Sequence, residues 1–462
     1  MTLWMPEVAD GPGPIYERLI AALERDVASG ALAPGTRLPP HRELAHLLKV
    51  GVGTVTRAYA EAESRGLIAA HVGRGSFVAE KAPARLGPGA AGGQGIDLAR
   101  NTPPFAPAAR RLADALGKLR HRPDLEEHLH YAPPEGFEAH RRAGADWLAR
   151  TAGFADADWR RLVCCGGAQQ GMTLALSTIC QPGDTVMTES ATFFGFKSLA
   201  EHAGYRLRGL AMDAEGVRPD AIARAAAEGA RVLYTVPTLQ NPTGRVMSLS
   251  RRQEVAEMAR RHDIWIVEDD IYAPYAVETG LPPLASLAPE RTFYVSGVSK
   301  VLAPGLRSGY MLPPPGRLYD EVLQHVRAFS YAPPSFGCLI ATQWIEDGTA
   351  DTIAREIRQD VRARTQLAKT ILAGAIETPG APQSLHVWLP MSELDAERVT
   401  RRTLRDGVRV TPPSAPMVSD AAETGVRLCL GGVADLGTLE KALLTVRAAL
   451  SEGIDAGVGD II

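Results

Sequence analysis

A lysine without an acidic neighbour is the first residue of this sequence that suggests chemistry. Lys300 lies in the run YVSGVSKVLAPGLRSGY (294–310) among small side chains, with no Asp or Glu within six positions on either side. Arg307 follows seven residues later. Nearby positive charge lowers the pKa of a lysine, and the neutral amine is the form that condenses with an aldehyde. The pattern therefore favours a lysine that forms a Schiff base.

Other reactive side chains follow apolar runs that are typical of strands. The turn GGAQQG (166–171) opens a helix and offers backbone N–H groups to a phosphate, although glycine turns after strands are mostly structural. Asn241 follows another run, and Asp269 and Tyr272 lie together in EDDIY (268–272). In an open parallel sheet such strand ends meet at one edge. Pyridoxal 5′-phosphate requires this set of groups: a phosphate cradle, a carboxylate for its ring nitrogen, donors for its phenolic oxygen and an amine for its aldehyde.

The elements that must position these residues alternate between apolar, strand-like runs and amphipathic helices such as 250–262. This alternation predicts the α/β class, with a mostly parallel sheet covered by helices. Beyond residue 345, a long helix, the strand LHVWLPM (385–391) and a last helix predict a smaller α+β part. The clearest predicted strands are 161–165, 185–189, 231–237, 264–270 and 292–297.

The N-terminal part of the chain has a different pattern. Three short helical patterns precede an alternating run around Gly73-Arg74-Gly75, which predicts a β-hairpin. Three helices and a hairpin predict a winged helix-turn-helix over 13–80. Residues 81–95 (KAPARLGPGAAGGQG) have little to bury and predict a flexible linker. The predicted α/β domain covers 96–455, with a large part at 130–340 and a small part at 345–455.

Composition excludes several classes of protein. A net charge of −3 over 462 residues does not suit a general polyanion binder, so any contact with nucleic acid must come from a local patch. The five cysteines form no CxxC pair, which indicates neither a disulfide framework nor a metal site. The N-terminus lacks a signal-peptide pattern, and no apolar run is long enough to span a membrane. We expect a cytoplasmic protein.

Short motifs in order along the chain carry a resemblance to known families. Over 96–450 the chain resembles the fold type I aminotransferases, in the stretches GGAQQG, TESATFFGF, QNPTG, EDDIY, SGVSKVLAPGLRSGY and GVRLCLG. The stretches GALAPGTRLPPHRELA, TVTRAYAEAESRGLI and GRGSFV resemble the GntR family. The whole architecture resembles the MocR group of bacterial regulators. That resemblance implies a pyridoxal-phosphate-binding regulator of transcription that forms a homodimer and binds double-stranded DNA.

The aminotransferase resemblance also implies roles for single residues. Lys300 would form the Schiff base, Asp269 would bond the pyridine nitrogen, and Arg427 would hold a ligand carboxylate. Gly297 departs from the family, which usually has a hydroxyl there to bind the phosphate. The other implied cofactor contacts are Ala168, Gln169, Ser299 and Arg307 on the phosphate, Asn241 and Tyr272 on the phenolic oxygen, Phe193 on the ring, and Tyr131 on the phosphate of the neighbouring subunit.

Plainer interpretations stay open for these residues. Lys300 alone is compatible with a surface position, Asp269 with a helix cap, and Arg427 with a strand salt bridge. Phe193 is also compatible with a core aromatic, and Tyr131 with a structural tyrosine.

The GntR resemblance implies DNA contacts, although residues 13–79 hold eight Lys or Arg against six Asp or Glu, a net charge of only +2. Binding then depends on where the charges stand. The third helix departs from the family, because Gly51-Val52-Gly53 replaces the usual Ser-Arg pair. The implied phosphate and base contacts are Arg42 on the second helix, Thr54, Thr56 and Arg57 on the third, and Arg74 on the wing.

Three functions remain compatible with the sequence. The first is a regulator that senses a small amino acid or amine; the resemblance places Arg427 where the family holds a carboxylate, which favours an effector that carries one. The second is a working aminotransferase with an appended DNA-binding domain. The third is a regulator that senses pyridoxal phosphate itself.

Overall fold

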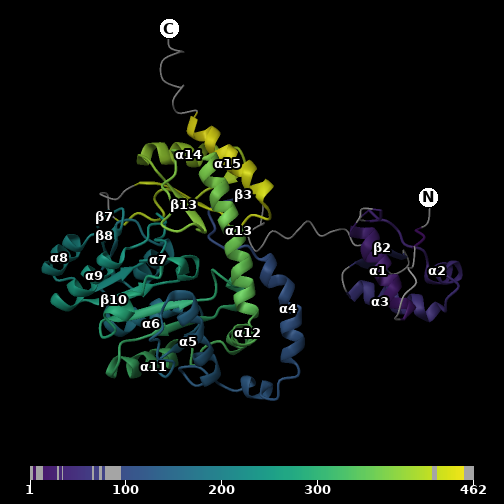
Figure 1. The fold of residues 1–462 in the computed structure, drawn as a ribbon, viewed down its shortest axis with the longest axis horizontal. Coiled ribbons are helices and arrows are strands. Elements are labelled where there is room, and N and C mark those ends of the chain that lie inside the picture. The colour runs from purple at the N-terminus through teal and green to yellow at the C-terminus, as the bar shows by residue number, and fades with distance from the viewer. Residues whose placement is uncertain are drawn as a thin grey trace, which may run out of the picture. The chain divides into compact units, whose positions relative to one another are not determined.

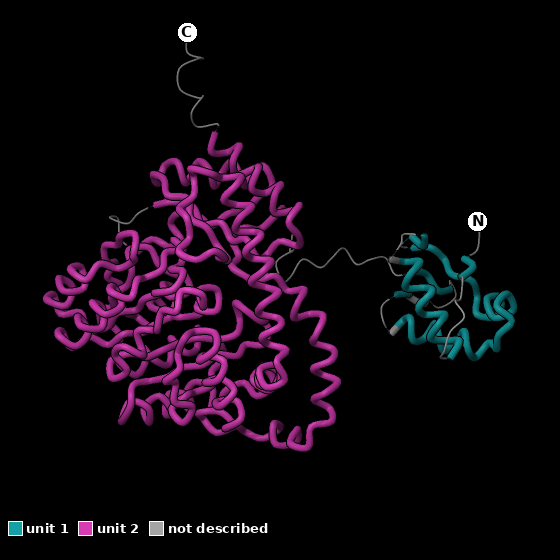
Figure 2. Tube along the Cα trace, viewed as in Figure 1, with its two compact units in different colours: residues 1–94 teal, residues 95–462 magenta. Residues whose placement is uncertain are grey.

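The chain forms two compact units, residues 1–94 and 95–462 (Figure 2). The computed structural model describes residues 4–6, 14–28, 31–33, 35–64, 67–71, 75–78, 95–418 and 424–451. The predicted linker lies outside these ranges except for Gly95, and so does Arg74 on the predicted wing.

The first unit contains three helices and a hairpin, as the sequence predicts. Leu19 and Leu23, one turn apart on the first helix, are buried against Val55 and Tyr59 of the third, whereas Ile15 at the helix start stays exposed. This apolar stripe holds the helices around one small core. The elements are α1 (Ile15–Ala28), α2 (His41–Leu47), α3 (Val52–Ser64) and the antiparallel strands β1 (Ile68–His71) and β2 (Gly75–Val78).

The second unit is built on a seven-stranded sheet with the order β4-β12-β11-β10-β9-β5-β6. Its strands are parallel except β12, which runs antiparallel to both neighbours, so the predicted mostly parallel sheet is confirmed. The sequence did not predict β6 and β12. Polar side chains alternate along β6 at the sheet edge, and β12 directly follows the loop that carries Lys300 and Arg307. The strands are β4 (Val163–Cys165), β5 (Thr185–Glu189), β6 (Arg206–Leu210), β9 (Val232–Thr235), β10 (Trp265–Asp269), β11 (Thr292–Gly297) and β12 (Gly309–Leu312).

Helices cover both faces of this sheet (Figure 1). On β10, Ile266 joins one apolar cluster and Val267 joins the other, since successive side chains of a strand point to opposite faces. Burial on both faces explains the continuous apolar runs in the sequence. The helices of this part are α4 (Ala106–Leu119), α5 (Glu138–Ala152), α6 (Ala168–Ile179), α7 (Phe194–His202), α8 (Pro219–Ala227), α9 (Leu249–Arg261), α10 (Leu284–Leu287), α11 (Arg317–Phe329) and α12 (Ser335–Glu346).

Short elements connect these helices and strands. The strands β7 (Met212–Asp213) and β8 (Gly216–Val217) form a small antiparallel pair. The 3₁₀ helices are η1 (Leu125–Leu129), η2 (Ala273–Tyr275), η3 (Val277–Thr279) and η4 (Pro304–Leu306).

A smaller part with its own apolar core follows the sheet. Its strand β14 pairs in parallel with β3 (Ile96–Asp97), which comes from the start of the unit. The chain that directly follows the predicted linker therefore belongs to the small part, which the sequence had placed within 345–455. The other elements are α13 (Thr349–Ile371), β13 (His386–Pro390), α14 (Glu393–Arg405), β14 (Val408–Arg409), β15 (Gly425–Cys429) and α15 (Leu436–Ser451).

Candidate cofactor and ligand site

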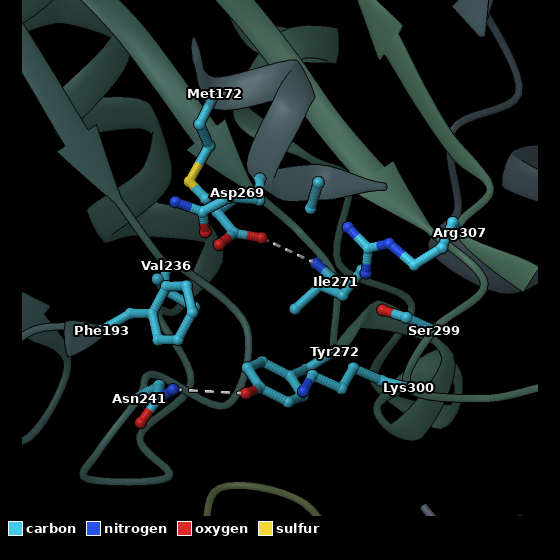
Figure 3. Close-up of a pocket in the computed structure, with 12 residues that line it drawn as sticks. Met172, Phe193, Val236, Asn241, Asp269, Ile271, Tyr272, Ser299, Lys300 and Arg307 are labelled. Atoms are coloured by element: carbon cyan, nitrogen blue, oxygen red, sulfur yellow. Dashed lines mark hydrogen bonds between the residues drawn. The ribbon is translucent and has the colours of Figure 1, made fainter. Parts of the chain in front are cut away.

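A cavity of about 150 Å³ lies where the parallel strands end (Figure 3). The segments that follow β4, β5, β9, β10 and β11 all contribute to its wall, as expected for an open parallel sheet. Every cofactor residue predicted from the sequence lines it except Tyr131. The lining residues are Ala168, Gln169, Met172, Phe193, Val236, Asn241, Asp269, Ile271, Tyr272, Ser299, Lys300 and Arg307.

Asp269, the last residue of β10, turns its carboxylate toward this cavity. Its Oδ2 accepts a hydrogen bond from the hydroxyl of Tyr234 at 2.9 Å, and burial raises its pKa to about 6. Asp270 points to the other face of the sheet, where the hydroxyl of Tyr294 donates to it at 3.1 Å. Strand alternation therefore separates the two adjacent carboxylates, and Asp269 is no helix cap.

Lys300 lies just beyond the end of β11 and turns its amine into the site. Nζ donates to the backbone oxygen of Asn101 at 2.5 Å. Its pKa is lowered to about 8, chiefly by burial and further by the positive charges of Arg427 and Arg307. The sequence predicted a lowered pKa from neighbouring charge alone, whereas burial is the larger cause. About a tenth of this amine is then neutral at pH 7, a far larger share than for an ordinary lysine.

Arg427, on β15, is buried and surrounded by neutral oxygens. Its guanidinium donates to Asn241 Oδ1 at 2.7 Å, to the backbone oxygen of Ala99 at 2.9 Å and to Thr411 Oγ1 at 3.1 Å. It forms no ion pair with any residue that the structure describes. Among the described residues, its charge meets only these neutral oxygens and the ring of Phe194 at 5.7 Å, and a carboxylate would be a stronger partner.

Small residues build the cradle beside the start of α6. A Cβ at Gly167 would lie 3.0 Å from Arg307 Nη2, and that guanidinium donates to the backbone oxygen of Gly166 at 2.6 Å. A Cβ at Gly297 would lie only 2.9 Å from the backbone oxygen of Ser308. The family hydroxyl at position 297 therefore does not fit between these strands. The first N–H groups of α6 have no partners within the helix and face the cradle together with Ser299 and Arg307.

Phe193 supplies an aromatic wall. It caps α7 and is half-buried, with part of its ring against the core and part lining the cavity. A Cβ at Gly195 would collide with the ring, so this ring position requires a glycine two residues later. Phe193 is therefore more than a core aromatic.

Sequence reasoning missed two residues that complete the site. Asn101 donates from Nδ2 to the hydroxyl of Tyr272 at 2.9 Å, and Nδ2 also lies 3.1 Å from Nδ1 of His386. His386 is fully buried on β13, and burial lowers its pKa to about 3. Asn101 carried no spacing signal in the sequence. A histidine inside the apolar run LHVWLPM was the available sign for His386.

The comparisons with known proteins agree with this geometry. Residues 94–443 match the family model described as aminotransferase class I and II. The chain belongs to this family. Residues 15–78 match the model described as bacterial regulatory proteins of the gntR family. The protein is thus a GntR-type regulator whose helix-turn-helix domain is fused to an aminotransferase-like domain.

Similar proteins carry both descriptions. The HTH-type transcriptional regulator YdeF of Bacillus subtilis is 28% identical over 97% of this chain and 97% of its own. The probable rhizopine catabolism regulatory protein MocR of Rhizobium meliloti is 24% identical over 95% and 94%. LysN, an α-aminoadipate aminotransferase of Thermus thermophilus complexed with N-(5′-phosphopyridoxyl)-L-leucine, has a TM-score of 0.66 at 22% identity and covers 78% of this chain and 93% of its own. The last likeness concerns the fold alone.

Three of the predicted DNA contacts, Arg42, Thr56 and Arg57, are exposed on the helix-turn-helix domain. Arg42 is exposed at the start of α2. On α3, Arg57 is exposed and stacks on the ring of Tyr16 at 4.1 Å, with a hydrogen bond to its hydroxyl at 3.3 Å. Thr56 donates to a backbone oxygen of its own helix and bonds His41 at 3.2 Å, whereas Thr54 is half-buried. The match to the gntR family implies that this domain binds DNA.

The start of α3 differs from the rest of that surface. Val52, which stands where the family has its Ser-Arg pair, is 44% exposed, and a Cβ at Gly53 would meet no atom within 4 Å. The first turn of α3 therefore carries no charge and leaves its backbone accessible.

Two further kinds of feature are absent from the part of the chain that the structure describes. Among these residues, no helix is both long and apolar enough to cross a membrane. The same residues contain no group of His, Cys, Asp and Glu that could hold a metal ion.

Proposed function

We propose that this protein is a transcriptional regulator whose aminotransferase-like domain binds pyridoxal 5′-phosphate and senses an amino acid or a carboxylate-bearing amine. One observation carries the proposal: Lys300, Asp269 and Tyr272 line one cavity together with Ala168, Ser299 and Arg307, the candidate phosphate contacts. Each of them offers what one part of the cofactor needs.

The chain's own groups divide the work of holding the cofactor. The first N–H groups of α6, Ser299 and Arg307 would bind the phosphate, and Phe193 would cover the ring. Asp269 would pair with the protonated ring nitrogen, which would restore the carboxylate charge that burial disfavours. When bound, the cofactor supplies an aldehyde and an electron-withdrawing ring, and Lys300 supplies the amine that holds it.

The effector class follows from Arg427. Its present partners are neutral, and a carboxylate makes a shorter and stronger charge-assisted bond. A ligand that holds both Arg427 and the cofactor would compete with the backbone oxygens of Ala99 and Asn101 for Arg427 and Lys300. Ala99 and Asn101 belong to the segment that directly follows the predicted linker. Occupancy of the site would therefore first alter the residues that directly follow the linker in sequence.

A homodimer completes the proposal. Tyr131 is 80% exposed and lies 4.6 Å, ring to ring, from Tyr331, which is 58% exposed. Exposed aromatic pairs are typical of protein interfaces. We propose that Tyr131 reaches the phosphate bound by the neighbouring subunit and that two helix-turn-helix domains bind one operator.

The test is spectroscopic and uses the full chain. Adding pyridoxal phosphate should produce a yellow absorbance band, and amino acids should then change that band while amines without a carboxylate do not. A wild type that stays colourless excludes the cofactor. Equal responses to both classes of amine exclude the role of Arg427.

A working aminotransferase is the second candidate. The lowered pKa of Lys300, about 8, is the observation that favours it, because an amine that exchanges protons near neutral pH can act as acid and base. Sustained conversion of a keto acid to an amino acid in the presence of an amino donor supports this candidate, and a single stoichiometric spectral change supports a sensor.

A further inference from the structure

A chain of hydrogen bonds links the small part of the second unit to Tyr272. Nε2 of His386 bonds the backbone oxygen of Gln240 at 3.0 Å, and its Nδ1 lies 3.1 Å from Nδ2 of Asn101. That amide nitrogen donates to the hydroxyl of Tyr272 at 2.9 Å. The bonded residues are 146, 285 and 171 positions apart in sequence, so only folding brings them together.

The first bond of this chain determines the direction of the others. A backbone carbonyl can only accept, so Nε2 of His386 carries a hydrogen toward Gln240. Burial lowers the pKa of His386 and holds it neutral, which leaves Nδ1 without a hydrogen, as an acceptor. Asn101 must therefore present its NH₂ group to His386 and to Tyr272. Its Oδ1, consistently, has no partner among the described residues.

A second chain reaches Tyr272 from Arg427. A guanidinium can only donate, so Oδ1 of Asn241 is the acceptor of the 2.7 Å bond from Nη1. The amide nitrogen of Asn241 then faces the hydroxyl of Tyr272 at 3.4 Å, as Figure 3 shows. The Tyr272 oxygen thus receives two N–H groups, and its own hydrogen remains to be donated into the cavity.

We propose that His386 and Asn101 are positioning residues that force Tyr272 to act as a hydrogen-bond donor toward the ligand in the cavity. The inference rests on the proposed function, because the acceptor there is the phenolic oxygen of pyridoxal phosphate. Asn101 acts on the amine as well, since its backbone oxygen accepts the hydrogen bond from Lys300. Asn101 therefore aligns both the hydroxyl of Tyr272 and the amine of Lys300.

The decisive variant is Asn101→Asp, which keeps the shape of the side chain and reverses its hydrogen-bond direction. An aspartate accepts the hydrogen of Tyr272 and withdraws it from the cavity. Loss of such a donor should lower the affinity for pyridoxal phosphate about tenfold. The pH midpoint of the bound chromophore should rise, because a donor to the phenolate stabilises its deprotonated form.

Two uncharged variants are needed as well, since Asn101→Asp also adds a negative group. Lys300 bonds the backbone oxygen of Asn101, and its pKa also responds to Asp269, Arg427 and Cys429. Asn101→Leu removes the amide without charge, and His386→Asn removes the anchor of the amide. Both should raise the midpoint in the same direction with about a threefold loss in affinity. His140→Asn is the matched control: His140 is equally buried, bonds Thr342 at 2.8 Å and lies outside the site.

The measurement is an absorbance titration from acid to alkaline pH on full-length protein with pyridoxal phosphate, with circular dichroism to check folding. The inference predicts the largest shift for Asn101→Asp, smaller shifts for Asn101→Leu and His386→Asn, and none for His140→Asn. If Asn101→Asp does not fold, the two uncharged variants decide. Wild-type titration in both of them overturns the inference and leaves cofactor binding intact. A wild type that binds no pyridoxal phosphate overturns the proposed function and the inference together.

Discussion

The two units of this protein present their candidate contacts in opposite ways. In the aminotransferase-like unit, Asn101 and His386 meet across 285 positions of sequence, and His386 is fully buried. In the helix-turn-helix unit, Arg42 and Arg57 are exposed on two helices that are close in sequence. A buried polar site depends on every partner, because an unmatched group is costly there. On an exposed basic surface, many side chains each contribute a little to the free energy of DNA binding.

This contrast predicts large effects of single substitutions in the cavity and small ones on the helices. The expected effects decrease from the buried carboxylate of the cavity to the exposed side chains of α3. A reversal of their order would contradict the comparison itself.

Asp269→Asn should have the largest effect. A buried ring nitrogen without its carboxylate costs on the order of 3–5 kcal/mol, which lowers affinity for pyridoxal phosphate by more than a hundredfold. Asp270→Asn is the matched control, since Asp270 is as buried but faces Tyr294 on the other side of the sheet. It should reduce thermal stability and keep the spectrum. Binding isotherms followed by absorbance measure both variants, and equal affinities would remove Asp269 from the site.

Arg427→Lys should keep the cofactor band and weaken the spectral response to amino acids. A lysine keeps the charge but loses the fork that holds a carboxylate with two parallel bonds. We therefore expect the amino-acid concentration at half-saturation to rise about 10- to 100-fold. Arg364→Lys is the control, because Arg364 is another buried arginine, bonded to the backbone oxygens of Leu430 and Val433. An unchanged titration in Arg427→Lys would make Arg427 a purely structural residue.

The rate of cofactor binding should depend on pH through Lys300. Its pKa is lowered to about 8, so the neutral amine increases about tenfold per pH unit below that value and then levels off. An ordinary lysine, with a pKa of ~10.4, would keep gaining reactivity well above that range. Stopped-flow absorbance between neutral and alkaline pH distinguishes the two curves. A rate that still climbs at the alkaline end is the contrary result.

Substitutions on α3 should give the smallest changes. Arg57→Ala should weaken DNA binding several-fold, reduce the salt slope by about 1 and leave the cofactor spectrum intact. Tyr16→Phe, which removes the hydroxyl partner of Arg57 but keeps the stacked ring, should act in the same direction and more weakly. Fluorescence anisotropy with a duplex recovered from a random library measures both. A salt slope that stays the same in Arg57→Ala would show that this arginine meets no phosphate.

Val52→Arg tests the surface of α3 by adding a positive charge rather than removing one. The exposed Val52 occupies the first turn of α3, and an arginine there adds a cation without displacing a packed side chain. We expect DNA affinity to increase a few-fold and preference for guanine to rise, since arginine bonds both acceptors of that base. The recovered sequences from a repeated selection give the readout, and an unchanged consensus would place Val52 outside the groove.

Much of the fold followed from the sequence by local rules. Alternating apolar runs and amphipathic helices predicted an α/β domain behind a helix-turn-helix, and chain order alone placed Asp269 and Lys300 at strand ends. Such features depend on neighbours within a few residues. The side-chain periods of helices and strands make them visible in the sequence. β3 escaped prediction because its two residues acquire their place only by pairing with β14, which lies over 300 positions later.

The direction of the hydrogen bonds in the site was decided by tertiary structure alone. The sequence determined which side chains can donate or accept, and the strand-end motifs determined which of them would gather near Lys300. It contained no sign that Asn101 and His386 would meet, or that burial would hold His386 neutral. A hydrogen bond has a range of about 3 Å and needs both partners in place, so a contact between residues 285 apart exists only after the chain has folded.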